Sequence, residues 1–145
     1  MNFHPLSVHF PIALLIVSWA CYVVGFIKKQ DFPFKVGSLL HSLGLIGIVL
    51  AIISGKIDSS GLTDMPHIQT LLRRHELMAY GSIWSFGMLW LWKYVRHKAL
   101  IDKLPSWEKW IYAIIFLLAL VFMGYSSHLG GTMVYEFGVN VQSVP

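Results

Sequence analysis

Residues 36–55 read VGSLLHSLGLIGIVLAIISG and contain no Asp, Glu, Lys or Arg. A helix needs roughly 20 apolar residues to cross the hydrocarbon of a bilayer, and this stretch has that length. It also carries glycine and serine at short intervals, which favour close contact between membrane helices. The stretch therefore predicts a helix that spans a membrane and packs tightly against a neighbouring helix.

Three further apolar stretches lie on either side of this one, at residues 6–27, 77–95 and 110–128. The chain is 56% hydrophobic and only 12% charged, whereas soluble domains are about one quarter charged. We therefore expect an all-α fold, an integral membrane up-down four-helix bundle that forms a single domain over residues 1–145. Residues 129–145 would form a tail outside the last span.

The basic residues are distributed unevenly over the loops of such a bundle. One side would hold only Lys56, Arg73 and Arg74. The other would hold Lys28, Lys29, Lys35, Lys93, Arg96, Lys98, Lys103 and Lys109. Because excess Lys and Arg in short loops marks the cytoplasmic face, we expect both termini outside the cell, in an inner (plasma) membrane.

The distribution of charge also argues against two simpler interpretations, nucleic acid binding and a cleavable signal peptide. The net charge of +4 does not indicate nucleic acid binding, because the basic residues flank the spans and form no separate patch. The first apolar run follows no basic segment and is long enough to span the bilayer. We therefore expect a membrane helix there rather than a cleavable signal peptide.

Histidine is the residue type that points to a site, because an imidazole inside a membrane protein needs a partner such as a metal. In the predicted topology five histidines lie towards the outer side: His4, His9, His67, His75 and His128. His41 falls deep in the second span, where a hydrogen-bonded packing role is favoured, and His97 falls in the cytoplasmic connection. We expect His67 to be a loop residue.

His9 and His75 would arrive at one depth on two different helices, and this pair is our preferred ligand pair. His128 would reach the same depth, and His4 lies just before the first span. Arg73 and Arg74 precede His75 and are expected either to anchor lipid headgroups or to bind cofactor carboxylates in a two-pronged way.

Small residues provide a further pattern. His41, Gly44, Ala51 and Gly55 share one stripe of the second span, which favours helix–helix contact, although a flat macrocycle would need the same lack of side chains. Candidate small positions facing such a ring are Gly44, Ala51, Ala79 and Gly124. The Gly130-Gly131 pair predicts the end of the fourth helix, and the tail after it could fold back over the outer end.

Three motifs together resemble one protein family. They are the opening His4-Pro5-Leu6-Ser7-Val8-His9-Phe10-Pro11, the Arg74-His75-Glu76 entry to the third span, and the closing Gly130-Gly131-x-x-Val134-Tyr135-x-x-Gly138-Val139-x-Val141. The chain resembles domain-of-unknown-function family 2231, a group of small four-helix membrane proteins. The resemblance implies site histidines at His4, His9 and His75. It also implies an electron-transfer setting, since members look fused to c-type cytochrome or Rieske-type modules.

Three functions follow as hypotheses. The first is a b-type haem protein with His9 and His75 as ligands, His128 as a substitute ligand, and Arg73 and Arg74 at the propionates. His4 is a further candidate for cofactor binding. The second is a copper or zinc site that uses the same imidazoles. The third is a structural or assembly subunit without cofactor. In each case we expect an electron carrier or subunit rather than a stand-alone enzyme, and a homo-oligomer is one assembly that we consider.

Overall fold

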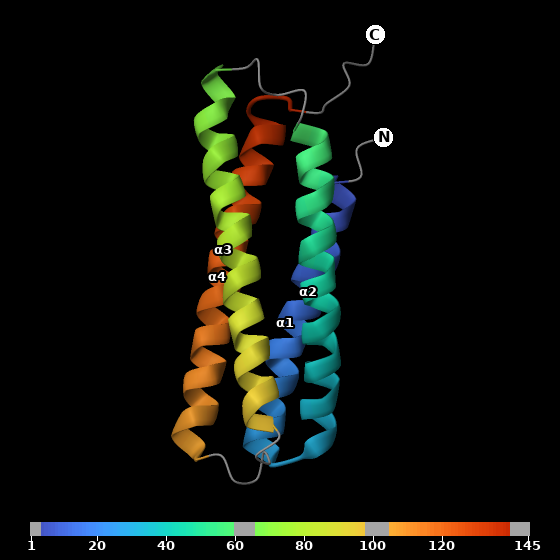
Figure 1. The fold of residues 1–145 in the computed structure, drawn as a ribbon, viewed down its shortest axis with the longest axis vertical. Helices are drawn as coiled ribbons and strands as arrows, with labels where there is room; N and C mark the ends of the chain where they lie inside the picture. The colour runs from blue at the N-terminus through green and yellow to red at the C-terminus, as the bar shows by residue number, and fades with distance from the viewer. Residues whose placement is uncertain (1–3, 60–65, 98–104, 140–145) are drawn as a thin grey trace.

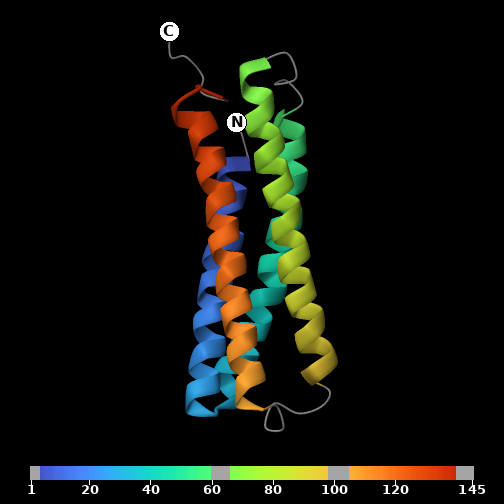
Figure 2. The same ribbon diagram turned by 90° about the vertical axis from the view of Figure 1, so that its left-hand side faces the viewer.

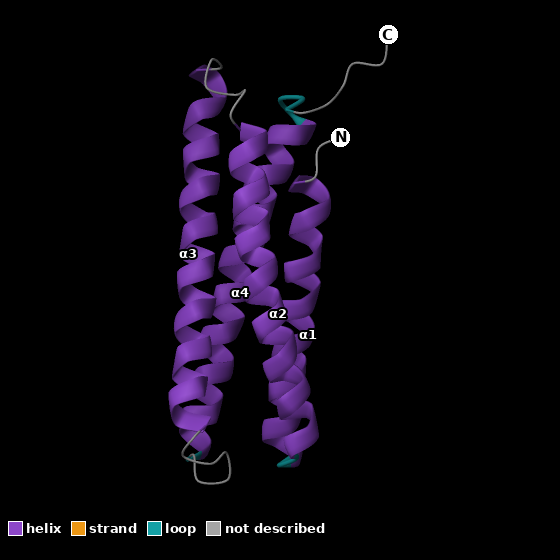
Figure 3. Ribbon diagram, turned by 45° about the vertical axis from the view of Figure 1, so that its right-hand side comes forward, coloured by secondary structure: helices purple, strands orange, loops and turns teal. Residues whose placement is uncertain are grey.

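The computed structural model describes residues 4–59, 66–97 and 105–139, apart from the side chains of Pro5, Leu6, His67 and His97. It contains four helices: α1 (His4–Lys28), α2 (Asp31–Ser59), α3 (Pro66–His97) and α4 (Ser106–Tyr135). The helices run alternately up and down and lie side by side along one long axis (Figures 1 and 2). The predicted all-α four-helix bundle is therefore confirmed, and the described residues outside the helices form only short turns (Figure 3).

The two ends of the bundle differ in composition. One end joins the start of α1, the end of α2, the start of α3 and the end of α4 (Figure 1); we call it the histidine end. The opposite end, which we call the lysine end, carries the α1–α2 turn and the start of α4. Basic residues described near the lysine end are Lys28, Lys29, Lys35, Lys93, Arg96 and Lys109.

Three of the helices are long and apolar enough to cross a membrane: residues 7–28 of α1, and the whole of α2 and α4. The mean hydropathy of helix α3 is too low for it to count among these candidate spans, because tryptophan, tyrosine, serine and Lys93 reduce it. It nevertheless runs beside the other three (Figure 1). Large apolar side chains such as Leu39, Ile46 and Leu118 point outward and are exposed, as a bundle surrounded by lipid requires.

Helices α1 and α2 pack closely through the small residues of α2. A Cβ atom added to Gly44 would lie 2.7 Å from Cγ of Leu15, and one added to Gly47 would lie 3.0 Å from Cβ of Pro11. The predicted helix–helix contact is therefore confirmed. Gly44 has no room for a macrocycle, so the expectation that it faces one is wrong. Gly124, also expected to face a ring, is exposed on α4, and no described atom lies near it.

Aromatic side chains fill the bundle between its middle and the lysine end. Tyr22, Phe86 and Phe116 are fully buried there, together with Leu15. His41 lies among them, 3.1 Å from the Phe86 carbonyl oxygen through Nε2 and 3.5 Å from the hydroxyls of Tyr22 and Tyr112 through Nδ1. His41 is thus a hydrogen-bonded packing residue, as the sequence favoured.

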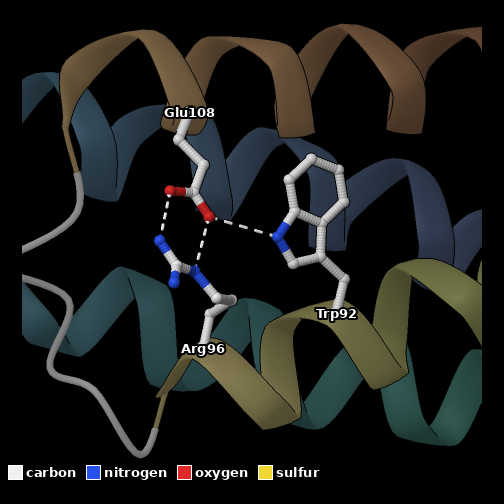
Figure 4. Close-up of polar contacts among 3 residues, drawn as sticks. All are labelled: Trp92, Arg96 and Glu108. Atoms are coloured by element: carbon white, nitrogen blue, oxygen red, sulfur yellow. Dashed lines mark hydrogen bonds and ion pairs between the residues drawn. The ribbon is translucent and has the colours of Figure 1, made fainter.

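An ion pair joins α3 to the first turn of α4 at the lysine end. The Arg96 guanidinium donates two hydrogen bonds to the Glu108 carboxylate, at 2.8 and 2.7 Å. The Trp92 indole N–H adds a third at 3.2 Å (Figure 4). Because the Glu108 side chain is only 7% exposed, this two-pronged arrangement supplies the partners that a buried carboxylate requires.

Helix α4 continues past Gly130 and Gly131 to Tyr135, so the helix end predicted at the paired glycines is wrong. Helix-interior glycine costs only about 1 kcal/mol, and the packing of the last turns outweighs that cost. The chain instead turns at Gly138, whose φ of 63° suits glycine. Val139 then packs against Ile68 and Met133, so this part of the tail does fold back over the histidine end. Residues 140–145 lie outside the described part.

Candidate functional site

A cavity of about 440 Å³ lies inside the histidine end. All four helices line it, and its wall is mostly apolar, with residues such as Ile12, Ile48 and Met123. Three of the predicted site histidines are among its lining residues: His4, His9 and His75. Pockets for small molecules and cofactors commonly have this size and this combination of apolar wall and few polar groups.

His75 is held in one tautomer by helix α4. Its Nδ1 lies 2.9 Å from the carbonyl oxygen of Ser126. A carbonyl only accepts hydrogen bonds, so Nδ1 must carry the proton and the lone pair of the neutral ring must be on Nε2. Gly130 allows this approach, because a Cβ atom there would lie 3.2 Å from Cε1 of His75.

His4 is held by a serine network on α2. Its Nδ1 lies 3.0 Å from the Ser54 hydroxyl, which in turn donates to the Ala51 carbonyl at 3.0 Å. The Ser7 hydroxyl lies 2.9 Å from Ser54 and donates to the carbonyl of His4. Since both hydroxyl protons go to carbonyls, Nδ1 of His4 is the donor to Ser54. The network therefore leaves the lone pair of His4 on Nε2 as well.

The backbone of His4 is fixed in addition. Its N–H donates to the Asp58 carboxylate at 3.3 Å, one turn beyond Ser54 on α2. A carboxylate at the first turn of α1 also interacts favourably with the positive end of the helix dipole. Ser54 and Asp58 together position both the side chain and the backbone of His4.

The two imidazoles meet across the bundle. Their ring centres are 6.1 Å apart and their planes are almost perpendicular, at 85°. They come from α1 and α3, which are diagonal in the bundle, since each of these helices packs chiefly against α2 and α4. Burial lowers the pKa of His4, and the neighbouring His75 lowers it further, while the Ala51 carbonyl and Asp58 act in the opposite direction. A neutral His4, able to offer a lone pair, is favoured.

Charged groups stand at the wall of the same cavity. Lys56 donates to Glu76 at 3.0 Å, which bridges α2 and α3, and Asp58 also lines the cavity. Sequence reasoning did not single out Ser54, Lys56 or Asp58 as site residues. The available signal was the spacing of Ser54 and Asp58, four residues apart at the end of an apolar helix, which places both on one helix face.

The remaining predicted site residues that the structure describes are exposed. His9 lines the cavity but its side chain is largely exposed. His128, Arg73 and Arg74 are exposed and do not belong to the cavity lining. His67 belongs to α3 rather than to a loop, and His97 is the last residue of α3; both side chains lie outside the described part. The structure thus joins His75 with His4, where the sequence favoured His9.

No set of three or more His, Cys, Asp or Glu side chains arranged to hold a metal ion occurs in residues 4–59, 66–97 and 105–139. The His4–His75 pair consists of two nitrogen donors alone. Any metal bound between them would need its other ligands from elsewhere.

Comparison with known proteins identifies the family. A family model described as "Predicted membrane protein (DUF2231)" matches residues 1–143, almost the whole chain. The chain therefore belongs to this family, and it is a membrane protein. Neither the curated proteins nor the solved structures give a significant match.

Proposed function

We propose that this member of the DUF2231 family binds one b-type haem through His4 and His75 and carries electrons at the histidine end. The observation that supports this most is the spacing of the two imidazoles. A metal–nitrogen bond is about 2 Å long and the ring centre lies roughly 1 Å beyond the nitrogen, so two imidazoles on opposite sides of one iron have centres about 6 Å apart. The observed value is 6.1 Å.

The donor set supports haem over a bare metal ion. Copper or zinc held by protein ligands usually takes three or four of them, and only two imidazoles converge here. Haem brings its own nitrogen ligands for iron, so the protein would have to supply only one or two side chains, here His4 and His75. Both Nδ1 atoms already donate to an oxygen acceptor, which is the outer-shell arrangement that metal-bound histidines typically have.

The surroundings of the pair are compatible with a flat apolar ring. Ala51, Gly55, Ala79 and Gly130 line the cavity and have small or no side chains. Lys56 is the Lys or Arg residue that lines the cavity among the described residues, whereas Arg73 and Arg74 are exposed and do not line it. We therefore expect Lys56 to pair with the carboxylates of the cofactor. Arg73 and Arg74 could contact those carboxylates only from outside the cavity.

Haem iron supplies reversible one-electron transfer, and the residues of this chain determine where that transfer occurs. His4 and His75 would hold the iron near the histidine end. The excess of basic residues at the lysine end favours an orientation in which that end faces the cytoplasm of an inner (plasma) membrane. A soluble c-type cytochrome or a Rieske-type protein on the outer side is the partner that fits this orientation.

The test is the spectrum of the purified protein expressed with ample haem. We expect one haem per chain and reduced-minus-oxidised changes in the Soret and α bands. His4→Ala and His75→Ala should each abolish the two-imidazole spectrum, whereas His9→Ala and His128→Ala should keep it. A wild-type protein without these bands would contradict the proposal. Metal analysis would then separate a copper or zinc carrier from a structural subunit.

A further inference from the structure

The two imidazoles of the His4–His75 pair have different outer partners. His75 donates to a backbone carbonyl, that of Ser126, which no substitution of the side chain removes. His4 donates through Nδ1 to a side-chain hydroxyl, that of Ser54, and the Ala51 carbonyl is the backbone group that also acts on this ring. The Ser54 hydroxyl, unlike the two carbonyls, is an oxygen that a side-chain substitution can remove.

We infer that Ser54 is a positioning residue that fixes the tautomer of His4 and thereby tunes the electron affinity of the metal group bound by the His4–His75 pair. This inference rests on the proposed function. Its structural basis is the chain of hydroxyls described above. Ser54 is oriented by its own bond to the Ala51 carbonyl at 3.0 Å and by contact with Ser7 at 2.9 Å, so its oxygen faces Nδ1 of His4 as an acceptor.

The physical effect follows from the direction of the hydrogen bond. A ligand imidazole that donates through Nδ1 becomes more electron-rich at Nε2 and stabilises the oxidised metal. Without the acceptor, His4 would lose part of that electron density and could also rotate or change tautomer. Removing the Ser54 hydroxyl should therefore favour the reduced state while leaving both nitrogen ligands in place.

Ser54→Thr and Ser54→Val provide the matched comparison, because the two side chains have the same shape and only threonine keeps the hydroxyl. Ser126→Ala is a control on the other ligand, since it removes a hydroxyl but leaves the carbonyl that His75 uses.

The measurement is a redox titration of the haem-loaded protein. At a fixed applied potential we expect Ser54→Val to raise the ratio of reduced to oxidised haem by about two- to tenfold, the equivalent of one lost hydrogen bond. Ser54→Thr and Ser126→Ala should stay close to wild type. If Ser54→Val loses its haem, retention by Ser54→Thr alone would support the inference equally. Identical behaviour of the Thr and Val variants would overturn it.

A second readout does not need haem. Nitrogen NMR of the haem-free protein reports the tautomer of His4, which should be the Nδ1–H form in wild type and in Ser54→Thr, but a mixture in Ser54→Val. A wild-type protein that binds no haem would refute the proposed function and with it the tuning. A mixed His4 tautomer in the wild-type protein would refute the role of Ser54 itself.

Discussion

The imidazole of His41 and the carbonyl oxygen of Phe86 are 3.1 Å apart, and this hydrogen bond ties α2 to α3 at a point where no water reaches. The bond satisfies a carbonyl of α3 as well as the only fully buried histidine of the described residues. We expect His41→Ala to destabilise the bundle by about 1–3 kcal/mol, through the cavity it leaves and the unpaired group. Unfolding in a denaturing detergent would measure this.

The same variant separates packing from ligation. His41 lies among aromatic rings and does not line the cavity of the histidine end. Any haem bound to His41→Ala should thus show the wild-type spectrum. Loss of haem from a folded His41→Ala protein would mean that the haem site lies near His41, and not at the histidine end.

The contact of Gly44 with Leu15 gives a second prediction. A methyl group at Gly44 would come within 2.7 Å of the Leu15 side chain, so Gly44→Ala should cost about 1–3 kcal/mol of stability through overpacking. Gly124→Ala is the control, because its methyl group would meet open space. There the better helix propensity of alanine should leave stability unchanged or slightly higher. Equal losses in both variants would contradict the α1–α2 contact.

The four-helix architecture was predictable because hydropathy acts over long stretches of chain. The helices α1, α2 and α4 were predictable as candidate spans from their length and lack of charge, and the stripe of small residues on α2 correctly predicted a close helix contact. The paired glycines did not end α4, because packing near His75 and Val139 outweighs a local preference. Helix ends are decided by such neighbours, which a single sequence does not place.

The sequence predicted the end of the bundle at which the candidate histidines gather, but not which of them faces His75. His4 and His9 are five residues apart and point in different directions on α1, and only the rotation of α1 against α2 decides which of them faces the bundle. That rotation depends on contacts such as Pro11 with Gly47 and His4 with Ser54. Arg73 and Arg74 are exposed and do not line the cavity, because adjacency to His75 in sequence puts them on other faces of the helix.

Substitutions at the adjacent residues Gly130 and Gly131 test whether His75 is a haem ligand. A methyl group at Gly130 would lie 3.2 Å from the His75 ring, whereas one at Gly131 would meet no described atom. We expect Gly130→Ala to push His75 out of position and to weaken haem binding severalfold. Gly131→Ala should bind as wild type does. Haem titration of the two purified variants measures the difference, and equal affinities would argue against His75 as the ligand.

The two ion pairs found among the described residues, Lys56–Glu76 and Arg96–Glu108, should differ in importance. Glu108 is buried and receives three hydrogen bonds, two from Arg96 and one from Trp92, while Glu76 and Lys56 are both considerably exposed. Glu108→Gln should therefore lower the unfolding temperature clearly, and Glu76→Gln should change it little. High salt should not reduce the difference. The reverse order in a thermal unfolding experiment would mean that the contact in Figure 4 does not anchor α4.

The orientation of the bundle can be read from two cysteine variants. Tyr135, near the histidine end, is 90% exposed, and Trp107, at the lysine end, is 64% exposed. In a background where Cys21 is replaced by serine, Tyr135→Cys should react with a membrane-impermeant maleimide on intact cells. Trp107→Cys should react only after the membrane is opened if the lysine end faces the cytoplasm, as its excess of basic residues predicts. The opposite pattern would put His4 and His75 on the cytoplasmic side. An outer cytochrome could then not be the partner, whereas the ligand assignment would be unaffected.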